Sequence, residues 1–486
     1  MKLELSNANG RDPVSTLNFT ADQQKAYFDL ISFINEDYNE KDYKRALVGA
    51  AGTGKTYLVK ALIKNCNLTY SLIGLAAPTH KACRVLQESI GLPNIKVNTL
   101  QSDLGLRLNF NVDKFDINHP PFDPKGRIKI GDYRLYIVDE ASMINRGLCT
   151  FLEQTCKTNK CKIIYIGDDS QLAPVGEKYS SSLRGIKTYK LAQIVRQEDD
   201  NPIRYLLELL RYDIKHRTFK FLEHISKVPE KFDDTFIKGY QVCKADEFNE
   251  TVYRFFNDEE ITKNVDYVKV VAYTNICVSG WNTFIRNAII KGSNKAVITK
   301  NDLFISYTTL VDAFNNPIIK NSEEYIVHNI VDYIHPKYDI KGFMVKLQAI
   351  HGGAISSPLF IVNHNDAFSI QKYVDVADRL INEAKNAKST LRAEKWKTYF
   401  QFKEGCLLLT NIIKRDGTTL YSRDLDYGFA LTSHKSQGST FDTVFVDVND
   451  IVYDKNGRVY TDAEEINRRL YVACSRAKTK IYLRYG

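Results

Sequence analysis

Short apolar runs without polar alternation recur in the first part of the chain, and stretches with helical periodicity separate them. The runs cover residues 45–50, 71–78, 134–140 and 162–168, and a helical stretch at 55–65 follows the first. Strands that are covered on both faces are apolar throughout. Strands that alternate with helices build βαβ units around a parallel sheet. This part of the chain is therefore predicted to form an α/β domain.

The same alternation returns towards the end of the chain, with predicted strands at 268–274, 443–448 and 480–485 and predicted helices at 275–290 and 462–474. Two segments interrupt it. Residues 102–132 are rich in Asn, Asp, Pro and Gly and are predicted to form a small hairpin. Residues 300–424 mix short alternating strands with one polar helical stretch, 374–397, which we expect to project into solvent. The pattern predicts two α/β domains, each with an insertion.

Composition narrows the class of protein without identifying it. A length of 486 residues favours several domains over a single core. The chain contains no apolar run near the ~18 residues that span a bilayer, and its first residues lack the apolar core of a secretory signal. We therefore expect a cytoplasmic protein. The net charge of +9 permits a polyanionic partner without requiring one.

The nine cysteines are expected to be free and reduced. Cys149, Cys156 and Cys161 lie close together in the sequence, but no CxxC pair or nearby His accompanies them. Structural cysteines on a helix and the following strand are a much stronger interpretation than a metal site.

The segment GAAGTGKT, from Gly49 to Thr56, fits the P-loop pattern completely and lies between a predicted strand and a predicted helix. Its glycines let the backbone curl so that N–H groups point at phosphate oxygens. The N-terminus of the following helix adds partial positive charge. Lys55 should reach the β- and γ-phosphates, and the Thr56 hydroxyl should bind Mg²⁺. The segment predicts a site for ATP.

Acidic and amide side chains follow two further predicted strands. Asp139 and Glu140 end the run at 134–140, and Gln171 lies in the loop after 162–168. A carboxylate opposite a P-loop can complete the Mg²⁺ shell, and its neighbour can orient or deprotonate the attacking water. Gln171 can contact both water and γ-phosphate. Taken by itself, its loop could instead use Asp168 or Asp169 as a helix cap.

A series of segments resembles the superfamily 1 DNA helicases, most closely the Dda-like, RecD-related members of the B subgroup. In order, the segments are FTADQQKAY (19–27), GAAGTGKT (49–56), LAAPTHKAC (75–83), VDEASM (138–143), GDDSQLAPV (167–175), the VRQ around Arg196, AYTN (272–275), LTSHKSQGSTFDTVFVD (431–447) and LYVACSRAKTKIYL (470–483). The resemblance covers the whole chain.

The resemblance implies an α/β fold with two RecA-like P-loop domains built on parallel sheets. The first would comprise residues 1–101 and 133–195, with a pin or hairpin subdomain at 102–132. The second would comprise residues 196–299 and 425–486, with an SH3-like subdomain and a helical arm at 300–424.

The resemblance also implies roles at the ATP site. Gln23 resembles the glutamine that reads adenine, and its neighbour Gln24 leaves the register open. Arg196 and Arg476 match arginines that approach the γ-phosphate. The implied catalytic residues are Lys55, Glu140, Gln171, Arg196 and Arg476. Thr56 and Asp139 would hold Mg²⁺, and the nucleotide would contact Gln23, Gly438 and the P-loop residues Gly49, Ala50, Ala51, Gly52, Thr53, Gly54, Lys55 and Thr56.

A second implied set contacts nucleic acid, where hydroxyls, amides and cations hold phosphates without reading bases. It consists of Thr79, His80, Gln101, Asn275, His434 and Lys435. Gln101 stands where a His is expected, which leaves its contact open. Phe110 or Phe115 would form the aromatic tip of a strand-separating pin. A small core anchor for the hairpin is the alternative for these two rings.

The implied activity is that of an ATP-dependent DNA helicase that moves 5′-to-3′ along single-stranded DNA and unwinds duplexes. We expect a monomer that acts on single-stranded and forked DNA, with single-strand-binding or replication proteins as candidate partners. Phage replication, recombination and bacterial repair are the candidate pathways, in the host bacterial cytoplasm if the protein is phage-encoded. An RNA helicase of the same superfamily stays open as an alternative. A binding protein with an inactive ATP site would lack one of the required residue types, and none is missing.

Overall fold

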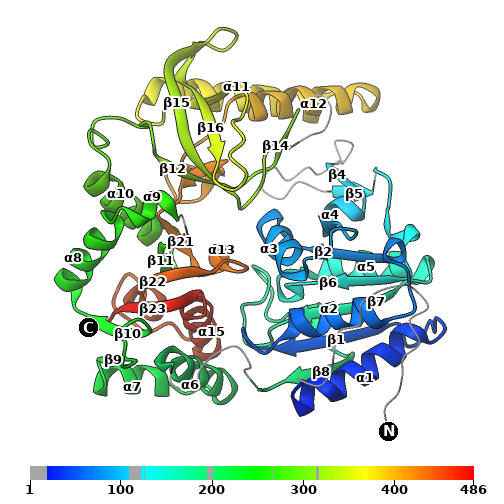
Figure 1. Cartoon of the computed structure of the whole chain (residues 1–486). Helices are drawn as coiled ribbons and strands as arrows, with labels where there is room; N and C mark the ends of the chain where they lie inside the picture. Colours follow the sequence, from blue (N-terminus) through cyan, green and yellow to red (C-terminus); the bar gives the residue numbers. More distant parts are fainter. Residues whose placement is uncertain (1–18, 109–121, 125, 194–200, 265, 313–316) are drawn as a thin grey trace. The chain divides into compact units, whose positions relative to one another are not determined.

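The computed structural model describes residues 19–108, 122–124, 126–193, 201–264, 266–312 and 317–486 (Figure 1). The chain forms two compact units. Unit 1 comprises Met1–Leu106, Pro124–Cys243 and Ser436–Gly486, and unit 2 comprises Arg107–Asp123 and Lys244–Lys435.

A six-stranded sheet in unit 1 has the order β3-β2-β6-β7-β1-β8, and every neighbouring pair is parallel. Its strands are β1 (Lys44–Gly49), β2 (Ile73–Ala77), β3 (Val97–Thr99), β6 (Leu135–Val138), β7 (Lys162–Gly167) and β8 (Lys187–Leu191). The sheet contains all four strands predicted for this region. The sequence pattern does not predict the edge strands β3 and β8, because three of the five residues of β8 are exposed and β3 is only three residues long.

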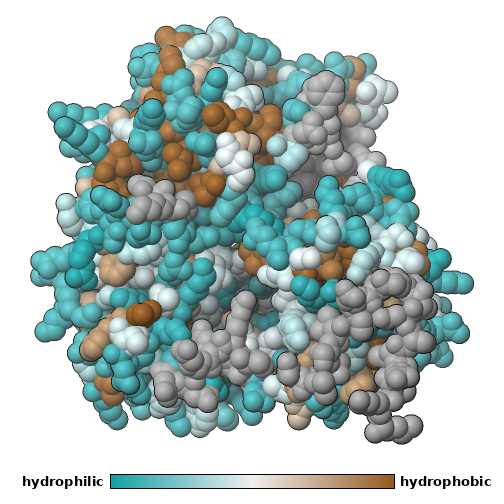
Figure 2. Space-filling model, in the orientation of Figure 1, coloured by the Kyte–Doolittle hydropathy of each residue, from teal (hydrophilic) through white to brown (hydrophobic). Residues whose placement is uncertain are grey.

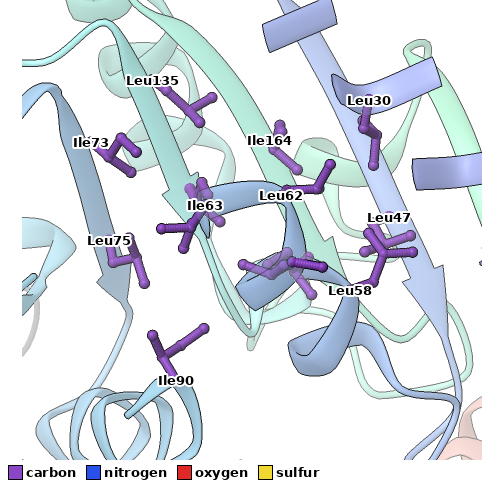
Figure 3. Close-up of a cluster of buried hydrophobic side chains, with 14 of the residues drawn as sticks. Leu30, Leu47, Leu58, Leu62, Ile63, Ile73, Leu75, Ile90, Leu135 and Ile164 are labelled. Carbon is purple, nitrogen blue, oxygen red and sulfur yellow. The ribbon is translucent and has the colours of Figure 1, made fainter. Parts of the chain in front are cut away.

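Helices pack on this sheet, and alternate strand residues supply a separate core to each face. They are α1 (Ala21–Asn35), α2 (Lys55–Asn65), α3 (His80–Ile90), α4 (Leu100–Asp103) and α5 (Arg146–Thr158). Leu47 and Ile164 lie in the core under α2, whereas Val48 and Tyr165, one residue later in each strand, lie in the core under α5. This follows from the two-residue period of a strand. Figure 3 shows Leu58 and Leu62 of α2 against Leu47 and Ile164.

Unit 1 also contains strands and helices from later in the chain. The strands are β9 (Glu230–Phe232), β10 (Gly239–Cys243), β22 (Phe441–Asp447) and β23 (Ala477–Arg484), and the helices are α6 (Pro202–His216), α7 (Lys220–Lys227), α14 (Val448–Val452) and α15 (Ala463–Cys474). β23 pairs in parallel with both β22 and β10, and β9 pairs with β10 in the antiparallel direction. α15 packs against α6.

Unit 2 contains a further parallel pair, β11 (Val268–Ala272) with β21 (Ala430–Thr432). Helices α8 (Ala245–Phe256), α9 (Glu260–Lys263), α10 (Asn275–Ile289) and α13 (Ser433–Ser436) accompany it. The predicted α/β class with parallel strands is confirmed, whereas the RecA-like identity of the two domains stays a prediction.

The segment between β11 and β21 builds an antiparallel sheet of order β17-β16-β15-β12-β20. Its strands are β12 (Leu303–Ser306), β15 (Glu324–His335), β16 (Ile340–Ala349), β17 (Leu359–Val362) and β20 (Leu425–Tyr427). Two small hairpins pair β13 (Leu310–Val311) with β14 (Pro317–Ile319), and β18 (Ile412–Ile413) with β19 (Thr419–Tyr421). Whether this insertion is SH3-like stays a prediction.

The prediction of one solvent-projecting helix at 374–397 is wrong. This segment forms two helices, α11 (Ala367–Asn386) and α12 (Ser389–Gly405). They pack on each other and bury Tyr373 and Ala377 of α11 with Trp396 and Tyr399 of α12. The small alanines allow close approach, and the large rings of α12 supply the buried area. The sequence pattern concealed this because few aliphatic side chains take part.

β4 (Leu106–Leu108) and β5 (Phe122–Pro124) form a two-stranded sheet in the segment for which a hairpin is predicted.

Eight of the nine cysteines are buried, none forms a disulfide, and Cys277 is partly exposed. Figure 2 shows a mostly hydrophilic face, with hydrophobic residues gathered over the part of unit 2 that carries β15 and β16. Among the described residues, none of the helices combines the length and apolarity that crossing a membrane requires.

Candidate functional site

Three adjacent strands of the unit 1 sheet end at the same edge. β6, β7 and β1 are consecutive in the sheet and parallel. The P-loop follows β1, Asp139 and Glu140 follow β6, and the loop with Gln171 follows β7. In parallel α/β sheets, ligands bind outside the carboxyl ends of the strands. The fold therefore brings together three segments that are spread over more than a hundred residues of the sequence.

The P-loop has a tight backbone conformation that depends on glycine. Gly52 and Gly54 have φ angles of 83° and 78°, in the left-handed region that other residues rarely adopt. A Cβ on Gly49 would lie 2.6 Å from the Thr53 hydroxyl oxygen and 2.8 Å from the carbonyl oxygen of Leu191. Thr53 is completely buried, and its hydroxyl donates to the carbonyl of Ala50 at 2.9 Å. Larger residues would disrupt this loop.

Lys55 begins α2 and lies over the P-loop. Its ammonium donates to the carbonyl oxygens of Gly49 at 2.6 Å and Ala50 at 2.9 Å. Thr56 follows and is half-buried, and Ala51 is exposed at the loop surface. An ammonium group, backbone N–H groups and a helix N-terminus at one place fit the phosphates of a nucleotide.

Gln23 connects the start of α1 to the P-loop. Its side-chain amide donates to the carbonyl of Thr53 at 2.8 Å, and its Oε1 accepts from the backbone N–H of Thr20 at 3.0 Å in a capping box. Gln24 is exposed, and its amide donates to the Phe19 carbonyl at 3.3 Å. The buried glutamine is thus Gln23. Reading adenine would require it to share or release these hydrogen bonds.

Asp139 and Glu140 form a half-buried acidic pair at the end of β6. Burial raises the pKa of Asp139. Burial and the charge of Asp139 raise the pKa of Glu140 to about 7, although Arg476 and Lys55 oppose the shift. The backbone of Glu140 has a φ of 49°, which is uncommon outside glycine and typical of strained functional positions.

This acidic pair suits a divalent cation. A buried carboxylate that is costly to ionise is stabilised by a cation, and oxygen ligands such as the Asp139 carboxylate and the Thr56 hydroxyl are those that Mg²⁺ prefers. Among the described residues, no three His, Cys, Asp or Glu side chains are arranged to hold a metal ion by themselves. Phosphate oxygens would therefore have to complete the shell, as is usual for Mg²⁺.

The loop after β7 holds Gln171 in a buried position. Asp168 accepts from the backbone N–H of Ser170 at 2.9 Å, which stabilises the turn. The Gln437 amide donates to the Leu172 carbonyl at 3.3 Å and lies 3.5 Å from Gln171 Oε1. Asp168 caps this turn and no helix begins there. Gln437 was not predicted, although it stands within the SQG of a motif segment.

Arg476 follows α15 and is buried. Its guanidinium donates to the carbonyls of Val472 at 2.9 Å and Ser439 at 3.0 Å and to the Ser475 hydroxyl at 2.8 Å. Burial lowers its pKa, and the negative charge of Glu140 is the largest opposing influence. Arg476 and Glu140 thus attract each other electrostatically within unit 1. Arg196, Phe110 and Phe115 lie outside the described residues.

Predicted nucleic-acid residues of unit 1 occupy helix starts. Thr79 caps α3 by accepting from the N–H of Ala82 at 3.2 Å, and His80 is the first residue of that helix. Gln101 is half-buried in α4. Gly438 has a φ of 72°, and a Cβ there would lie 3.7 Å from that of Ala82. Gly438 therefore lies beside the first turn of α3.

In unit 2, Asn275 and Lys435 belong to one cluster with two residues of the insertion. Arg423 donates to Asn275 Oδ1 and to the Tyr307 hydroxyl, both at 3.0 Å, and its guanidinium lies 4.6 Å from the Tyr307 ring centroid. The Lys435 ammonium lies 4.2 Å from the same ring and donates to Asn321 at 3.0 Å. His434 precedes Lys435 in α13. Tyr307 and Arg423 were not predicted, because no local motif marks them.

Two family models match the chain. The model described as an AAA domain matches residues 32–231, and the model described as a UvrD-like helicase C-terminal domain matches residues 427–484. The first range contains the P-loop, the acidic pair and Gln171, and the second contains Gln437 and Arg476. The chain is a superfamily 1 DNA helicase that combines these two domains. It is an ATP-hydrolysing P-loop enzyme.

The relatives of this helicase differ in sequence identity and in the share of each chain that the match covers. An uncharacterized protein of Acanthamoeba polyphaga mimivirus is 23% identical over 95% of this chain and 99% of its own length. The ATP-dependent RecD2 DNA helicase of Deinococcus radiodurans is 32% identical over 32% of this chain, which corresponds to 20% of that protein.

Solved structures of similar proteins include two Pif1 helicases. The Candida albicans protein is 17% identical with a TM-score of 0.46, and the match covers 96% of this chain and 94% of that one. The Bacteroides protein, in complex with ADP-AlF3 and single-stranded DNA, is 15% identical with a TM-score of 0.48, over 96% and 92% of the two chains.

Proposed function

We propose that this helicase hydrolyses ATP to move 5′-to-3′ along single-stranded DNA and to unwind duplex DNA ahead of it. The observation that carries the proposal is the gathering of the P-loop, the acidic pair, the Gln171 loop and Arg476 in unit 1. The direction of movement rests on the resemblance to the B subgroup, because the chemistry of the ATP site is the same for both directions.

At the ATP site, Lys55 and the N–H groups of the P-loop bind the phosphates, and Thr56 and Asp139 would hold Mg²⁺. When bound there, the ion would supply positive charge against the phosphate oxygens. Glu140 accepts a proton from the attacking water, and Gln171 orients that water. Arg476 and Arg196 stabilise the charge that develops on the transferred phosphoryl group.

Single-stranded DNA contacts Thr79, His80 and Gln101 from unit 1 and Asn275, His434 and Lys435 from unit 2. The cluster around Tyr307 supports the proposed DNA contacts in unit 2. Arg423 and Lys435 provide positive charge for phosphates, and an aromatic ring beside them offers a surface on which a base can stack. Arg423 and Tyr307 therefore contact the DNA together with Asn275 and Lys435.

The decisive experiment measures ATP hydrolysis with and without a single-stranded DNA oligonucleotide. We expect DNA to stimulate the wild type and Lys55→Ala to reduce the stimulated rate by at least about a hundredfold. Lys64→Ala, which removes a lysine from the last turn of the same helix, is the matched control and should retain activity. A wild type that hydrolyses no ATP in the presence of DNA would refute the proposal.

The direction is tested with two duplexes that carry a single-stranded tail at either the 5′ or the 3′ end. We expect unwinding of the 5′-tailed duplex alone. Unwinding of only the 3′-tailed substrate would reverse the assigned direction. An RNA oligonucleotide that stimulates hydrolysis more strongly than DNA of the same sequence would instead favour an RNA helicase.

A further inference from the structure

One face of α15 holds the loop that carries Gln171. The Tyr471 hydroxyl donates to Asp168 Oδ2 at 2.6 Å. Arg468, three residues earlier, donates from Nη1 to the main-chain carbonyls of Asp169 at 2.6 Å and Gln171 at 2.8 Å. Residues three apart lie on the same side of a helix. The two side chains therefore hydrogen-bond to the Gln171 loop at both its beginning and its end.

Arg468 is oriented for this contact by its own helix. Its Nε and Nη2 donate to Glu464 Oε1 at 3.2 Å and 3.0 Å. A guanidinium is planar and presents its donors in fixed directions. The ion pair on one edge thus leaves Nη1 directed at the two loop carbonyls. A lysine could satisfy the ion pair or the carbonyls but could not reproduce this geometry.

The Tyr471–Asp168 hydrogen bond is shielded from water, since the two residues are only 1% and 3% exposed. Burial and the adjacent negative charge raise the pKa of Tyr471 well above its ordinary value, so the hydroxyl stays protonated and donates. Asp168 also accepts from the N–H of Ser170. The Asp168 carboxylate consequently bridges Tyr471 of α15 and the backbone of the Gln171 loop.

The same helix leads directly to Arg476. α15 ends at Cys474, and Arg476 donates back to the Val472 carbonyl in its last turn. The element that fastens the Gln171 loop therefore also carries the arginine that faces Glu140. A displacement of the loop from α15 would change the position of Gln171 relative to Arg476.

We propose that Arg468 and Tyr471 are positioning residues for ATP hydrolysis, which fix the Gln171 loop to α15 so that Gln171 and Arg476 act in one geometry. This inference rests on the proposed function of Gln171 and Arg476. It assigns a role to two side chains that need not touch the nucleotide, so their removal should slow hydrolysis without weakening nucleotide binding.

The test compares Arg468→Ala, Arg468→Lys and Tyr471→Phe with the wild type in DNA-stimulated ATP hydrolysis. Misplacement of a reacting group costs roughly 10- to 100-fold in rate. We expect kcat to fall by about that factor in Arg468→Ala, with a KM for ATP and an affinity for ADP that change less than about threefold. Arg468→Lys should stay impaired. Tyr471→Phe, which loses a single hydroxyl, should also lower kcat, but by a smaller factor than Arg468→Ala.

A double-mutant cycle separates this role from a structural one. If Arg468 acts through Gln171, Arg468→Ala should cause no further loss of kcat in a Gln171→Ala background. Arg204→Ala is the matched control, because Arg204 forms the same kind of (i, i+4) ion pair, with Glu208 on α6, at 3.1 Å. It should leave kcat unchanged. Melting curves recorded for every variant report whether the fold is retained.

Three outcomes would overturn the inference: an unchanged kcat in Arg468→Ala, losses that multiply with those of Gln171→Ala, or a fall in activity that parallels a fall in melting temperature. If the wild type itself shows no DNA-stimulated hydrolysis, the proposed function fails. If the wild type is active and the Arg468 and Tyr471 variants are unaffected, only this inference fails.

Discussion

Single residues of unit 1 carry conformations or contacts that other residue types could not maintain. Glu140 holds a left-handed backbone beside Asp139, and Gly54 holds one at the start of α2. A Cβ on Gly54 would lie 2.4 Å from the amide nitrogen of Gln23, which donates to Thr53. The P-loop and the buried Gln23 in the first turn of α1 therefore depend on each other.

Gly54→Ala should therefore damage the P-loop in two ways. A left-handed alanine costs about 1–2 kcal/mol, and its Cβ would displace the Gln23 amide from Thr53. We expect a lower melting temperature and a weaker affinity for ADP, measured by fluorescence of a labelled nucleotide. Gly185→Ala is the matched control, with a φ of 69° and no atom within 4 Å of the added Cβ. It should lower stability alone, and equal nucleotide affinities in the two variants would contradict the prediction.

Asp426 should make stability depend on pH. Burial raises its pKa to about 6 from an ordinary value near 3.8, although Arg423 opposes the shift. A carboxyl whose pKa is higher in the folded state stabilises the fold below its unfolded pKa, and this contribution is lost as pH rises through the folded pKa. Between about pH 4 and pH 6, the wild type should lose up to about 3 kcal/mol of unfolding free energy relative to Asp426→Asn. Urea denaturation measures this, and parallel pH profiles would disprove it.

At the scale of elements, unit 2 depends on contacts that connect its parts. The α11–α12 pair packs its aromatic rings against β16 and β17. Lys269 of β11 forms a fully buried ion pair with Glu324 of β15 at 2.6 Å and also donates to the carbonyl of Gly428. The insertion is thus joined to the parallel strand β11 by a charged contact that tolerates little displacement.

Trp396→Ala should destabilise this insertion. The indole is almost completely buried between α11 and α12, and truncating a buried Trp to Ala costs about 3–5 kcal/mol. We expect an early unfolding phase in circular dichroism melts, while nucleotide affinity in unit 1 is retained. The neighbouring Lys395→Ala removes a partly exposed ion pair with Glu383 and should cost well under about 1 kcal/mol. Equal melting curves for the two variants would exclude a core role for Trp396.

At the scale of the whole molecule, charge and binding are connected. The chain carries a net charge of +9, and the proposed DNA contacts include Lys435 and Arg423. A protein that neutralises phosphates releases counterions, so binding weakens as salt concentration rises.

The affinity for a single-stranded oligonucleotide should fall with salt at a log–log slope of roughly 0.7 per phosphate neutralised. Arg423→Ala should weaken binding and reduce the slope by about 0.7, since it would remove one proposed phosphate contact. Arg204→Ala removes an arginine of equal charge from α6 and should leave the slope unchanged. Fluorescence anisotropy at several salt concentrations measures both quantities, and a slope that Arg423→Ala does not alter would argue against this contact.

Much of the fold was predictable because it is encoded locally. The strand, glycine-rich loop and helix around Gly49–Thr56 follow from an apolar run, a turn signal and a helical period within about twenty residues. Helical periodicity within a short segment likewise predicts α10 and α15. By contrast, the sequence pattern predicts one solvated helix where α11 and α12 form, because their core consists of alanines and aromatic rings that pack only when the two helices meet.

The sequence by itself determined which residue types stand at the ATP site and which family the chain resembles, since motif chemistry depends on neighbours along the chain. Only the tertiary structure decided that Arg468 and Tyr471 hold the Gln171 loop and that Arg423 and Tyr307 join Asn275 and Lys435. These partners lie more than a hundred residues apart or stand in segments without a motif. Their contacts arise from packing between elements, which no local pattern records.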